Sequence, residues 1–436
     1  MNLKSNATGG RLGDLFVAFF SIISCGLLQP SGAGIITIKK RLEGVSSIAV
    51  FFITFIDHRA LSAKMISMQR LASCLIFLIS SLFLHAQTTN RSSNGQLQVI
   101  AYYSGNAAQL AQYPVEKLTH IIYSFCHLKG NRLNVDNAND TATIRTLIAA
   151  KQRNPSLKVM LSLGGWGGCE QCSPVFATEV NRKVFASSVK QLCDYFGADG
   201  IDLDWEYPAI KGHPGHPYSK DDRQNFTSLI VALRDSLGSQ REISFAAGGL
   251  DNFLQESVEW LKVTRLVDRI NLMSYDLVGG FDTVTGHHTP LYSNSSQLSS
   301  ADHAINYLVK IGVPADKIVI GAAFYARTWV NVPPTNNGLY QPGRFKSFIP
   351  YQSFAEQLST KSGFVFYYDS VAKASYAYNA KKKEFATFDD ERSIRLKTSY
   401  ALKNKLNGIM FWELTLDKPS KGYVDLIDSI KSTAAH

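Results

Sequence analysis

The segment DGIDLDWEYP carries four carboxylates within eight residues, at Asp199, Asp202, Asp204 and Glu206. Carboxylates held this close together cannot all stay ionised, because each negative charge raises the pKa of its neighbours. A carboxyl group that remains protonated near neutral pH can act as a general acid. Glu206 is the last of the row and the nearest to the following loop, so we predict that it delivers a proton to a substrate.

Apolar residues alternate with the acids of this segment, at Ile201, Leu203 and Trp205. Side chains of a β-strand point alternately to its two faces, so a strand would place the last three acids on one face and the apolar residues on the other. A calcium loop is the alternative, but such loops need a different glycine position and small intervening residues. The pattern therefore predicts a buried strand whose acidic face is turned toward a cleft.

Eight short apolar runs of this kind recur along the chain, separated by segments of helical period. The runs are QVIAYYS, HIIYSF, KVMLSLGGW, DGIDLDW, EISFAAGG, RINLMSYD, KIVIGAAFYAR and GIMFWEL. Alternating strands and helices predict parallel pairing, and eight such units close into a (β/α)8 TIM barrel of the α/β class. A doubly wound open sheet is the structural alternative, but it usually has fewer strands. In a barrel, the acids would lie at the carboxyl ends of the strands, where barrel enzymes keep their chemistry.

About eighty residues separate the seventh run from the eighth, which is more than one loop and one helix require. This interval contains GFVFYYDS and SYAYNAKKKEFATFDD together with turn residues. We predict a small α+β insertion at about residues 331–391, between the seventh and eighth barrel strands.

These motifs together resemble glycoside hydrolase family 18, the chitinases and their relatives. The acidic run is similar to the family signature DxxDxDxE. LSLGGW is similar to the family's SxGG strand, and NLMSYD to its Met-x-Tyr-Asp motif. FYAR is similar to its FYGR motif, with Ala326 in place of glycine, and GIMFWEL is similar to its last strand. The matching residues outside the acidic run are Ser162, Gly164, Gly165, Met273, Tyr275, Asp276, Tyr325, Arg327 and Trp412. The resemblance extends from about Gln98 to Lys431, and the insertion resembles that of one bacterial chitinase subgroup.

The resemblance implies a retaining, substrate-assisted hydrolysis, in which the acetamido carbonyl of the sugar attacks the anomeric carbon and forms an oxazolinium. Glu206 would protonate the leaving oxygen and then activate water. Asp204 would orient the acetamido N–H, Asp202 would share a proton with Asp204, and Tyr275 would donate to the acetamido oxygen. The mechanism implies no metal and no organic cofactor.

Further residues are expected to bind the substrate or to support the site. Trp412 would form an apolar floor and Asp276 would contact the distorted sugar, with Met273, Tyr325, Arg327, Tyr102, Phe125 and Trp166 as further substrate-binding residues. Tyr102 and Phe125 could instead belong to the core, and Trp166 and Trp329 could line a sugar track or simply pack. Asp199, Ser162, Gly164 and Gly165 are expected to be structural. Ser162 has no general-base partner in the sequence that would make it a nucleophile.

Histidine and cysteine pairs give weaker signals. His213 with His216, and His287 with His288, have spacings compatible with metal binding, but without carboxylate or cysteine partners we expect them to be ordinary loop histidines. The pair Cys169 and Cys172 is expected to form a local disulfide, rather than a redox pair or a zinc site. The remaining cysteines of the barrel, Cys126 and Cys193, are expected to be buried thiols.

Composition and charge are those of a globular protein with a sizeable core. The chain has 436 residues, 45% of them hydrophobic and 18% charged, with a formal net charge of +10. Half of this charge lies in residues 1–86, and no run of like charge suggests nucleic acid. The family resemblance implies a chitinase that acts on chitin or chito-oligosaccharides, and we expect it to be a monomer. An endo-β-N-acetylglucosaminidase acting on N-glycan cores and a non-catalytic chitin-binding lectin are the alternatives, and the presence of Glu206 disfavours the lectin.

The first part of the chain has the features of a leader. MQRLASCLIFLISSLFLHA, residues 68–86, combines one arginine, an apolar core and a terminal alanine, as in a secretory signal peptide. We therefore expect residues 87–436 to be secreted, with translation starting at Met65 or Met68 and residues 1–67 not native. A lipoprotein signal ending at Cys25 is the alternative, and a periplasmic or lipid-anchored protein would follow from it.

Mass spectrometry of the exported protein tests this interpretation. We expect a mature N-terminus close to residue 87, because signal peptidase cuts after the short apolar core. A mature chain that begins with a lipid-modified Cys25 would contradict it.

Overall fold

The computed structural model describes residues 96–434. The predicted leader, with Met65, Met68 and Cys25, lies outside the described residues. Within them, none of the helices is both long enough and apolar enough to cross a membrane.

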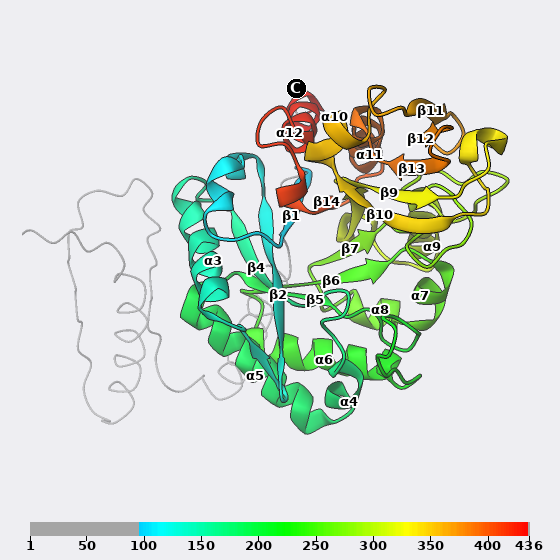
Figure 1. Ribbon diagram of the computed structural model, residues 1–436. Coiled ribbons are helices and arrows are strands. Elements are labelled where there is room, and N and C mark those ends of the chain that lie inside the picture. The colour runs from blue at the N-terminus through cyan, green and yellow to red at the C-terminus, as the bar shows by residue number, and fades with distance from the viewer. Residues whose placement is uncertain (1–95, 435–436) are drawn as a thin grey trace, which may run out of the picture. The chain divides into compact units, whose positions relative to one another are not determined.

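The core of the structure is a closed barrel of eight parallel strands (Figure 1). Its strands are β1 (Gln98–Tyr103), β2 (His120–Lys129), β4 (Lys158–Gly164), β5 (Gly200–Asp204), β6 (Glu242–Gly248), β7 (Arg269–Met273), β8 (Ile318–Ala323) and β14 (Gly408–Trp412). Pairing of β1 with both β14 and β2 closes the barrel, and the short β3 (Arg132–Asn134) extends β2 as an antiparallel hairpin. The predicted (β/α)8 fold is confirmed, because each of the eight apolar runs supplies one barrel strand.

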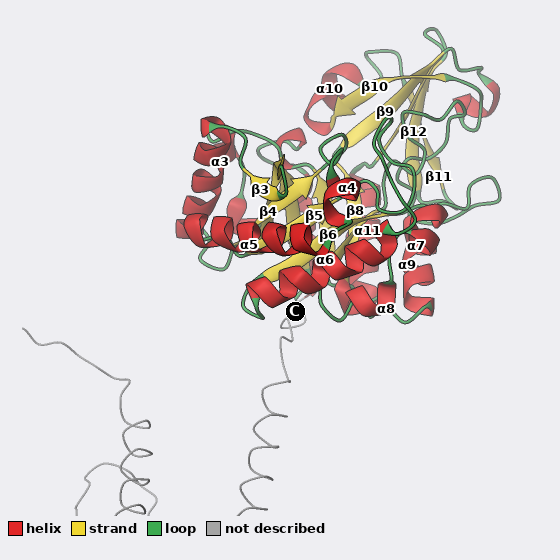
Figure 2. Ribbon diagram, turned by 90° about the horizontal axis from the view of Figure 1, so that it is seen from below, coloured by secondary structure: helices red, strands yellow, loops and turns green. Residues whose placement is uncertain are grey.

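Helices surround the strands, as Figure 2 shows from a second direction. They are α3 (Ala138–Ala149), α4 (Cys172–Phe176), α5 (Glu179–Phe196), α6 (Asp222–Leu237), α7 (Asp251–Glu256), α8 (Trp260–Val263), α9 (Ala301–Lys310), α11 (Glu391–Lys403) and α12 (Tyr423–Ala434). Side chains of Asn137, Thr178, Ser300 and Asp390 accept hydrogen bonds from the first backbone N–H groups of α3, α5, α9 and α11. The sequence thus sets where these four helices begin.

The insertion is a five-stranded antiparallel sheet with strand order β10-β9-β13-β12-β11. Its elements are β9 (Tyr325–Val330), β10 (Arg344–Pro350), α10 (Phe354–Gln357), β11 (Val365–Asp369), β12 (Ala374–Asn379) and β13 (Glu384–Phe388). The single run KIVIGAAFYAR therefore contains two strands, β8 in the barrel and β9 in the insertion. The insertion sheet begins at Tyr325, earlier than the predicted residue 331, because hydrophobicity along a continuous apolar run does not show where its pairing partner changes.

A buried ion pair joins the end of the insertion to the barrel. Asp389 follows β13 and accepts hydrogen bonds from the Lys397 ammonium at 2.7 Å, from the Thr289 hydroxyl at 3.1 Å and from the Ala323 N–H at 3.0 Å. Asp389 and Lys397 are both fully buried. Since Ala323 ends β8 and Lys397 lies on α11, this one carboxylate connects the insertion, a barrel strand and a barrel helix.

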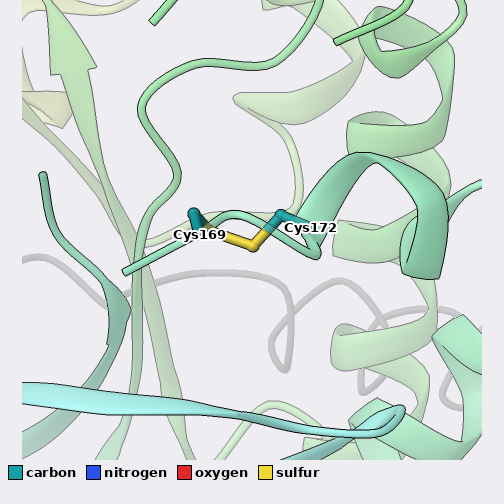
Figure 3. The surroundings of a disulfide bond; sticks show 2 residues. All are labelled: Cys169 and Cys172. Carbon is teal, nitrogen blue, oxygen red and sulfur yellow. A yellow bond between two sulfur atoms is a disulfide. The ribbon is translucent and has the colours of Figure 1, made fainter. Parts of the chain in front are cut away.

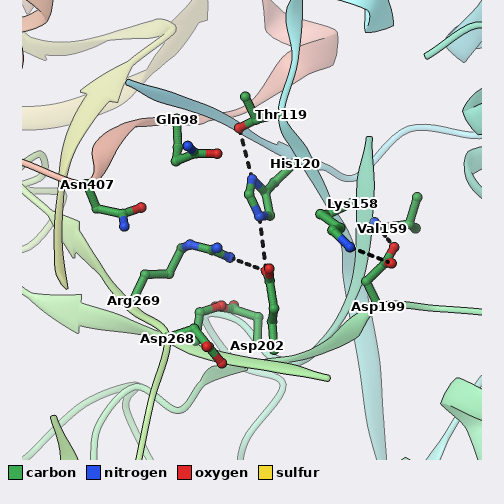
Figure 4. A network of polar contacts seen from close by, with 12 residues as sticks. Gln98, Thr119, His120, Lys158, Val159, Asp199, Asp202, Asp268, Arg269 and Asn407 are labelled. Carbon is green, nitrogen blue, oxygen red and sulfur yellow. Dashed lines mark hydrogen bonds and ion pairs between the residues drawn. The ribbon is translucent and has the colours of Figure 1, made fainter. Parts of the chain in front are cut away.

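A second polar network closes the amino end of the barrel (Figure 4). The Glu242 carboxylate lies 3.0 Å from His120 Nε2 and accepts from Arg269 Nη1 at 2.7 Å. Burial opposes ionisation of Glu242, but its contacts with His120 and Arg269 outweigh this effect and hold its pKa below the usual range. Asp199 lies nearby, where it accepts from the Val159 N–H at 2.7 Å. The first acid of the signature therefore supports the base of the barrel rather than the cleft.

Loss of the buried ion pair is expected to destabilise the fold. Lys397→Met leaves Asp389 buried without its ammonium partner, which typically costs about 3–5 kcal/mol. Lys183→Met is the matched control, because Lys183 pairs with Glu179 on the exposed surface of α5, where water screens the pair and its loss should change the stability little. Urea unfolding at constant pH measures both. Equal free energies of unfolding for the two variants would contradict this account.

Candidate active site

Asp202 is the fixed centre of the acidic row. It is fully buried on β5, and four donors from four other strands surround its two oxygens. These are the hydroxyl groups of Tyr102 at 3.1 Å, Ser162 at 2.9 Å and Ser244 at 2.6 Å, and the amide of Asn271 at 3.1 Å. Burial raises the pKa of Asp202, and the four donors oppose that rise. Asp202 is thereby held in one orientation.

Two of these donors, Ser244 and Asn271, were not predicted. Each is a polar residue in a largely apolar run, and this is the one feature of the sequence that could have indicated a role in the site. In the parallel ladder Ser162 and Ser244 lie directly opposite Asp202 on β4 and β6. Strand alternation predicts that the polar residues point inward, but only the register shows that they meet Asp202.

Asp204 is buried and incompletely paired. Its Oδ1 atom has no hydrogen-bond partner among the described residues. Burial raises the pKa of Asp204 well above its usual value, and the charges of Glu206 and Asp202 raise it further. A carboxyl group in this setting favours the protonated form or needs a donor from outside the chain.

Glu206 follows β5 and is partly exposed. Burial of its carboxyl group raises its pKa to about 7. A hydrogen bond from Tyr207 lowers the pKa, and the negative charge of Asp276 raises it. The chain therefore places a carboxylic acid with a near-neutral pKa beside the opening of the barrel. This is the property expected of a general acid.

Asp276, just after β7, is the ionised acid of the site. Arg327 donates to both of its oxygens, at 2.7 and 2.6 Å, and the Tyr325 hydroxyl donates at 2.8 Å. Burial opposes its ionisation, but the Arg327 contacts outweigh this and hold its pKa below the usual range. Tyr325 and Arg327 belong to β9, so the insertion sheet supplies one wall of the site.

His287 and His288 lie in a loop, as expected, but the expectation that they lack carboxylate partners is wrong. Both side chains are fully buried, and each faces a carboxylate. His287 Nε2 lies 3.1 Å from Asp369, and His288 Nδ1 lies 3.5 Å from Asp276. The sequence could not show the first partner, because Asp369 comes from the insertion. Among residues 96–434, no group of three or more histidines, cysteines and acids is arranged to hold a metal ion.

Aromatic residues line the interior of the barrel beside the acids. Trp412 lies at the end of β14, 5.7 Å from the nearly parallel ring of Phe125 and 5.8 Å from Tyr102. Among the described residues, the Tyr275 hydroxyl forms a hydrogen bond with the Met410 sulfur alone, at 3.7 Å. Met273, Tyr275 and Tyr325 pack in the same cluster. Tyr102, expected in the cleft, is instead almost fully buried, and its hydroxyl serves Asp202.

Two glycines allow the end of β4 to approach the site. A Cβ atom on Gly164 would lie 2.3 Å from the Asp204 carbonyl oxygen, and one on Gly165 would lie 2.2 Å from the Phe125 ring. Both residues also have positive φ, +107° and +80°, which disfavours any other residue type. The structure therefore gives Gly164 and Gly165 a supporting role.

The structure distinguishes Trp166 from Trp329, for which the sequence allowed either sugar binding or packing. Trp329 is fully buried and its indole N–H donates to the Asp282 carbonyl at 3.1 Å, so it packs. Trp166 is 48% exposed and lies 5.9 Å from the Phe281 ring, which is 72% exposed. Sequence reasoning missed Phe281. The two rings form an exposed aromatic pair, which we call the rim pair.

The cysteine predictions are confirmed. Cys169, in the loop that follows Trp166, forms a disulfide with Cys172, the first residue of α4 (Figure 3). Cys126 and Cys193 are free and buried.

Comparisons with known proteins agree with this geometry. The family Glycosyl hydrolases family 18 matches residues 98–417. Chitinase A1 of Niallia circulans is 31% identical over 397 residues, 74% of this chain and 56% of that protein. Chitinase 1 of Aphanocladium album is 29% identical over 361 residues, 74% of this chain and 81% of that protein. The oviduct-specific glycoprotein of Mus musculus is 31% identical, and the chain covers only 43% of it.

Solved structures give the same assignment. A glycoside hydrolase family 18 N-acetylglucosaminidase from Paenibacillus barengoltzii has a TM-score of 0.70 and 35% identity, covering 77% of this chain and 99% of that one. Chitinase ChiA74 from Bacillus thuringiensis has a TM-score of 0.72 and 27% identity, covering 78% and 70%. With the barrel, the acidic row and the match over residues 98–417, this chain belongs to glycoside hydrolase family 18.

Proposed function

We propose that this protein is a secreted chitinase, which hydrolyses β-1,4 bonds between N-acetylglucosamine units with retention of configuration. The observation that carries the proposal is the state of the acidic row. Glu206 has a pKa of about 7, while Asp204 is buried with an unpaired oxygen. Glu206 can give a proton, and Asp204 needs a hydrogen-bond donor that the described part of the chain does not supply.

An acetamido sugar fits this demand. Its N–H would donate to the free Oδ1 of Asp204, which would turn the acetamido carbonyl toward the anomeric carbon. Attack by that carbonyl would form a cyclic oxazolinium while Glu206 protonates the departing oxygen. Within residues 96–434, the Tyr275 hydroxyl has a hydrogen bond to the Met410 sulfur alone, so it is available to the acetamido oxygen. Water activated by Glu206 would then open the ring and restore the acetamido group.

The remaining carboxylates are poorly suited to nucleophilic attack. Four donors surround Asp202, and Asp276 is held by Arg327 and Tyr325. A carboxylate with its lone pairs engaged is a weak nucleophile, and this supports a mechanism in which the substrate provides its own. It also supports Asp276 as a contact for the sugar rather than as a reacting group.

An N-acetylglucosaminidase is the second candidate. The Paenibacillus protein is described by that activity, and this chain covers 99% of it at 35% identity. The same acidic row would serve an enzyme that removes single sugars or one that cuts N-glycan cores. The product profile on a chitin hexamer distinguishes these functions: single sugars indicate the N-acetylglucosaminidase, and disaccharides and longer fragments indicate a chitinase. Activity only on a glycoprotein would indicate an N-glycan enzyme.

Secretion is part of the proposal. The Cys169–Cys172 disulfide supports it, since disulfides persist mainly in oxidising compartments. We expect the mature protein to act as a monomer on chitin or chito-oligosaccharides.

Replacement of the acid tests the assignment of Glu206. We expect Glu206→Gln to lower kcat on an aryl chitobioside by about 10²–10⁴-fold, because the amide cannot donate the proton. Binding of a chito-oligosaccharide, measured by calorimetry, should survive. Glu179→Gln, on the exposed surface of α5, is the matched control and should keep wild-type kcat. Wild-type turnover by Glu206→Gln would show that another residue is the acid.

The pH profile tests the electrostatics. We expect kcat/KM to fall above about pH 7, as Glu206 loses the proton that it must donate. Asp276→Asn removes a negative charge that raises the Glu206 pKa, so the midpoint of this alkaline limb should move to lower pH whatever the remaining rate. Asp282→Asn, in the same loop, changes an acid whose carboxylate accepts from the Gly279 N–H, and it should leave the midpoint in place. A shift to higher pH in Asp276→Asn would be incompatible with this account.

A further inference from the structure

Trp166 lies in a glycine-rich segment whose residue types restrict the backbone little. The sequence around it is GGWGGCEQC, with two glycines on each side of the indole. Glycine gives the backbone more freedom than any other residue, so a tryptophan between glycine pairs needs outside constraints to keep one position. The nearest candidate for such a constraint is the Cys169–Cys172 disulfide, three residues further along.

The disulfide is buried in the hydrophobic core and lies against Gly164, in the segment before Trp166. Cys169 is 3% exposed and Cys172 is fully buried, and both belong to the main hydrophobic core. The Cys169 sulfur lies 3.2 Å from the place that a Cβ atom of Gly164 would take. The turn is also closed by hydrogen bonds from the Gly168 N–H to the Gly165 carbonyl, at 2.8 Å, and from the Cys172 N–H to the Cys169 carbonyl, at 3.1 Å.

Trp166 itself bridges two other loops. Its ring lies 5.3 Å from the His213 ring, in an edge-on arrangement, and 5.9 Å from Phe281. The backbone N–H of His213 donates to the backbone carbonyl oxygen of Glu206, at 3.5 Å. The position of the exposed rim pair relative to the acid therefore depends on how the GGWGG segment is held.

The side chains that hold the two supporting acids come from elsewhere. Asp202 is held by side chains of β1, β4, β6 and β7, and Asp276 by side chains of β9. None of these side chains lies in residues 165–172. The Gly165 N–H donates to the backbone carbonyl of Asp204 at 2.9 Å, a contact that does not involve the disulfide. Loss of the disulfide should therefore affect the rim pair more than the chemistry.

We infer that the Cys169–Cys172 disulfide is a positioning device for Trp166, and that it sets the affinity for extended sugar chains without a part in bond cleavage. Its effect on sugar chains rests on the proposed function. The same inference has a consequence that needs no substrate: without the disulfide, residues 165–172 should become mobile while the barrel stays folded.

The test uses the full chain with both cysteines replaced, Cys169→Ser with Cys172→Ser. We expect KM for a chitin hexamer to rise about three- to tenfold, as expected when one aromatic contact is lost, and Trp166→Ala to give a similar rise. The kcat on an aryl chitobioside should stay within about twofold of the wild type. Cys193→Ser is the matched control: it also removes a buried sulfur of the core, but no disulfide, and should leave the KM for the hexamer unchanged.

Hydrogen exchange of the free protein provides the substrate-independent readout. Amides of residues 165–172 should exchange faster in the double variant than in the wild type, and those of β4 and β5 should not. If the wild type neither binds nor cleaves the hexamer but this local change occurs, the proposed function fails and the positioning role stands. Unchanged exchange in residues 165–172 together with an unchanged KM would overturn the inference.

Reduction of the folded wild type covers the case in which the double variant does not fold. A dithiol supplies two electrons and two protons, so the S–S bond breaks, two thiols form and the dithiol becomes a cyclic disulfide. Mass spectrometry of the peptide containing both cysteines verifies the reduced state. Faster exchange of residues 165–172 in that state supports the inference, and wild-type exchange and KM in the verified reduced protein would refute it.

Discussion

Burial of like charges on a single strand is the constraint on which the rest of this site depends. Asp202, Asp204 and Glu206 lie in or directly after β5, where water cannot screen them fully. The barrel resolves their repulsion by treating each acid differently. Four donors hold Asp202, Asp204 keeps one oxygen without a partner among residues 96–434, and Glu206 has a near-neutral pKa. One strand thereby supplies a support, an acceptor and an acid.

The insertion is an integral part of this arrangement. Its first strand brings Arg327 and Tyr325 to Asp276, which keeps that acid ionised, and the charge of Asp276 helps to raise the pKa of Glu206. At the other end of the insertion, Asp389 follows β13, and its buried ion pair with Lys397 connects the insertion to α11. The electrostatics of the acid therefore depend on a sheet that lies outside the barrel.

Much of the fold and part of the site could be read from residue types. The eight apolar runs predicted the barrel strands, because each is bounded by polar loops and followed by a helix-period segment. The inward row of acids followed from strand alternation. The start of the insertion at Tyr325 could not be read, since β8 and β9 form one continuous apolar run. The partners of Asp202 were missed at Ser244 and Asn271 for a related reason: each looks like an isolated polar residue until the strands are in register.

The sequence by itself determined the chemistry that is available: a spaced row of acids, the family signature around it, and a local cysteine pair. These depend on residue identity and on short-range alternation, which the linear order contains. Only the tertiary structure decided which groups meet. It paired His287 with Asp369, buried Trp329 while exposing Trp166, and brought Phe281 beside Trp166. Such contacts join residues far apart in the chain, and their free energies depend on burial and register, which closure of the barrel and docking of the insertion establish.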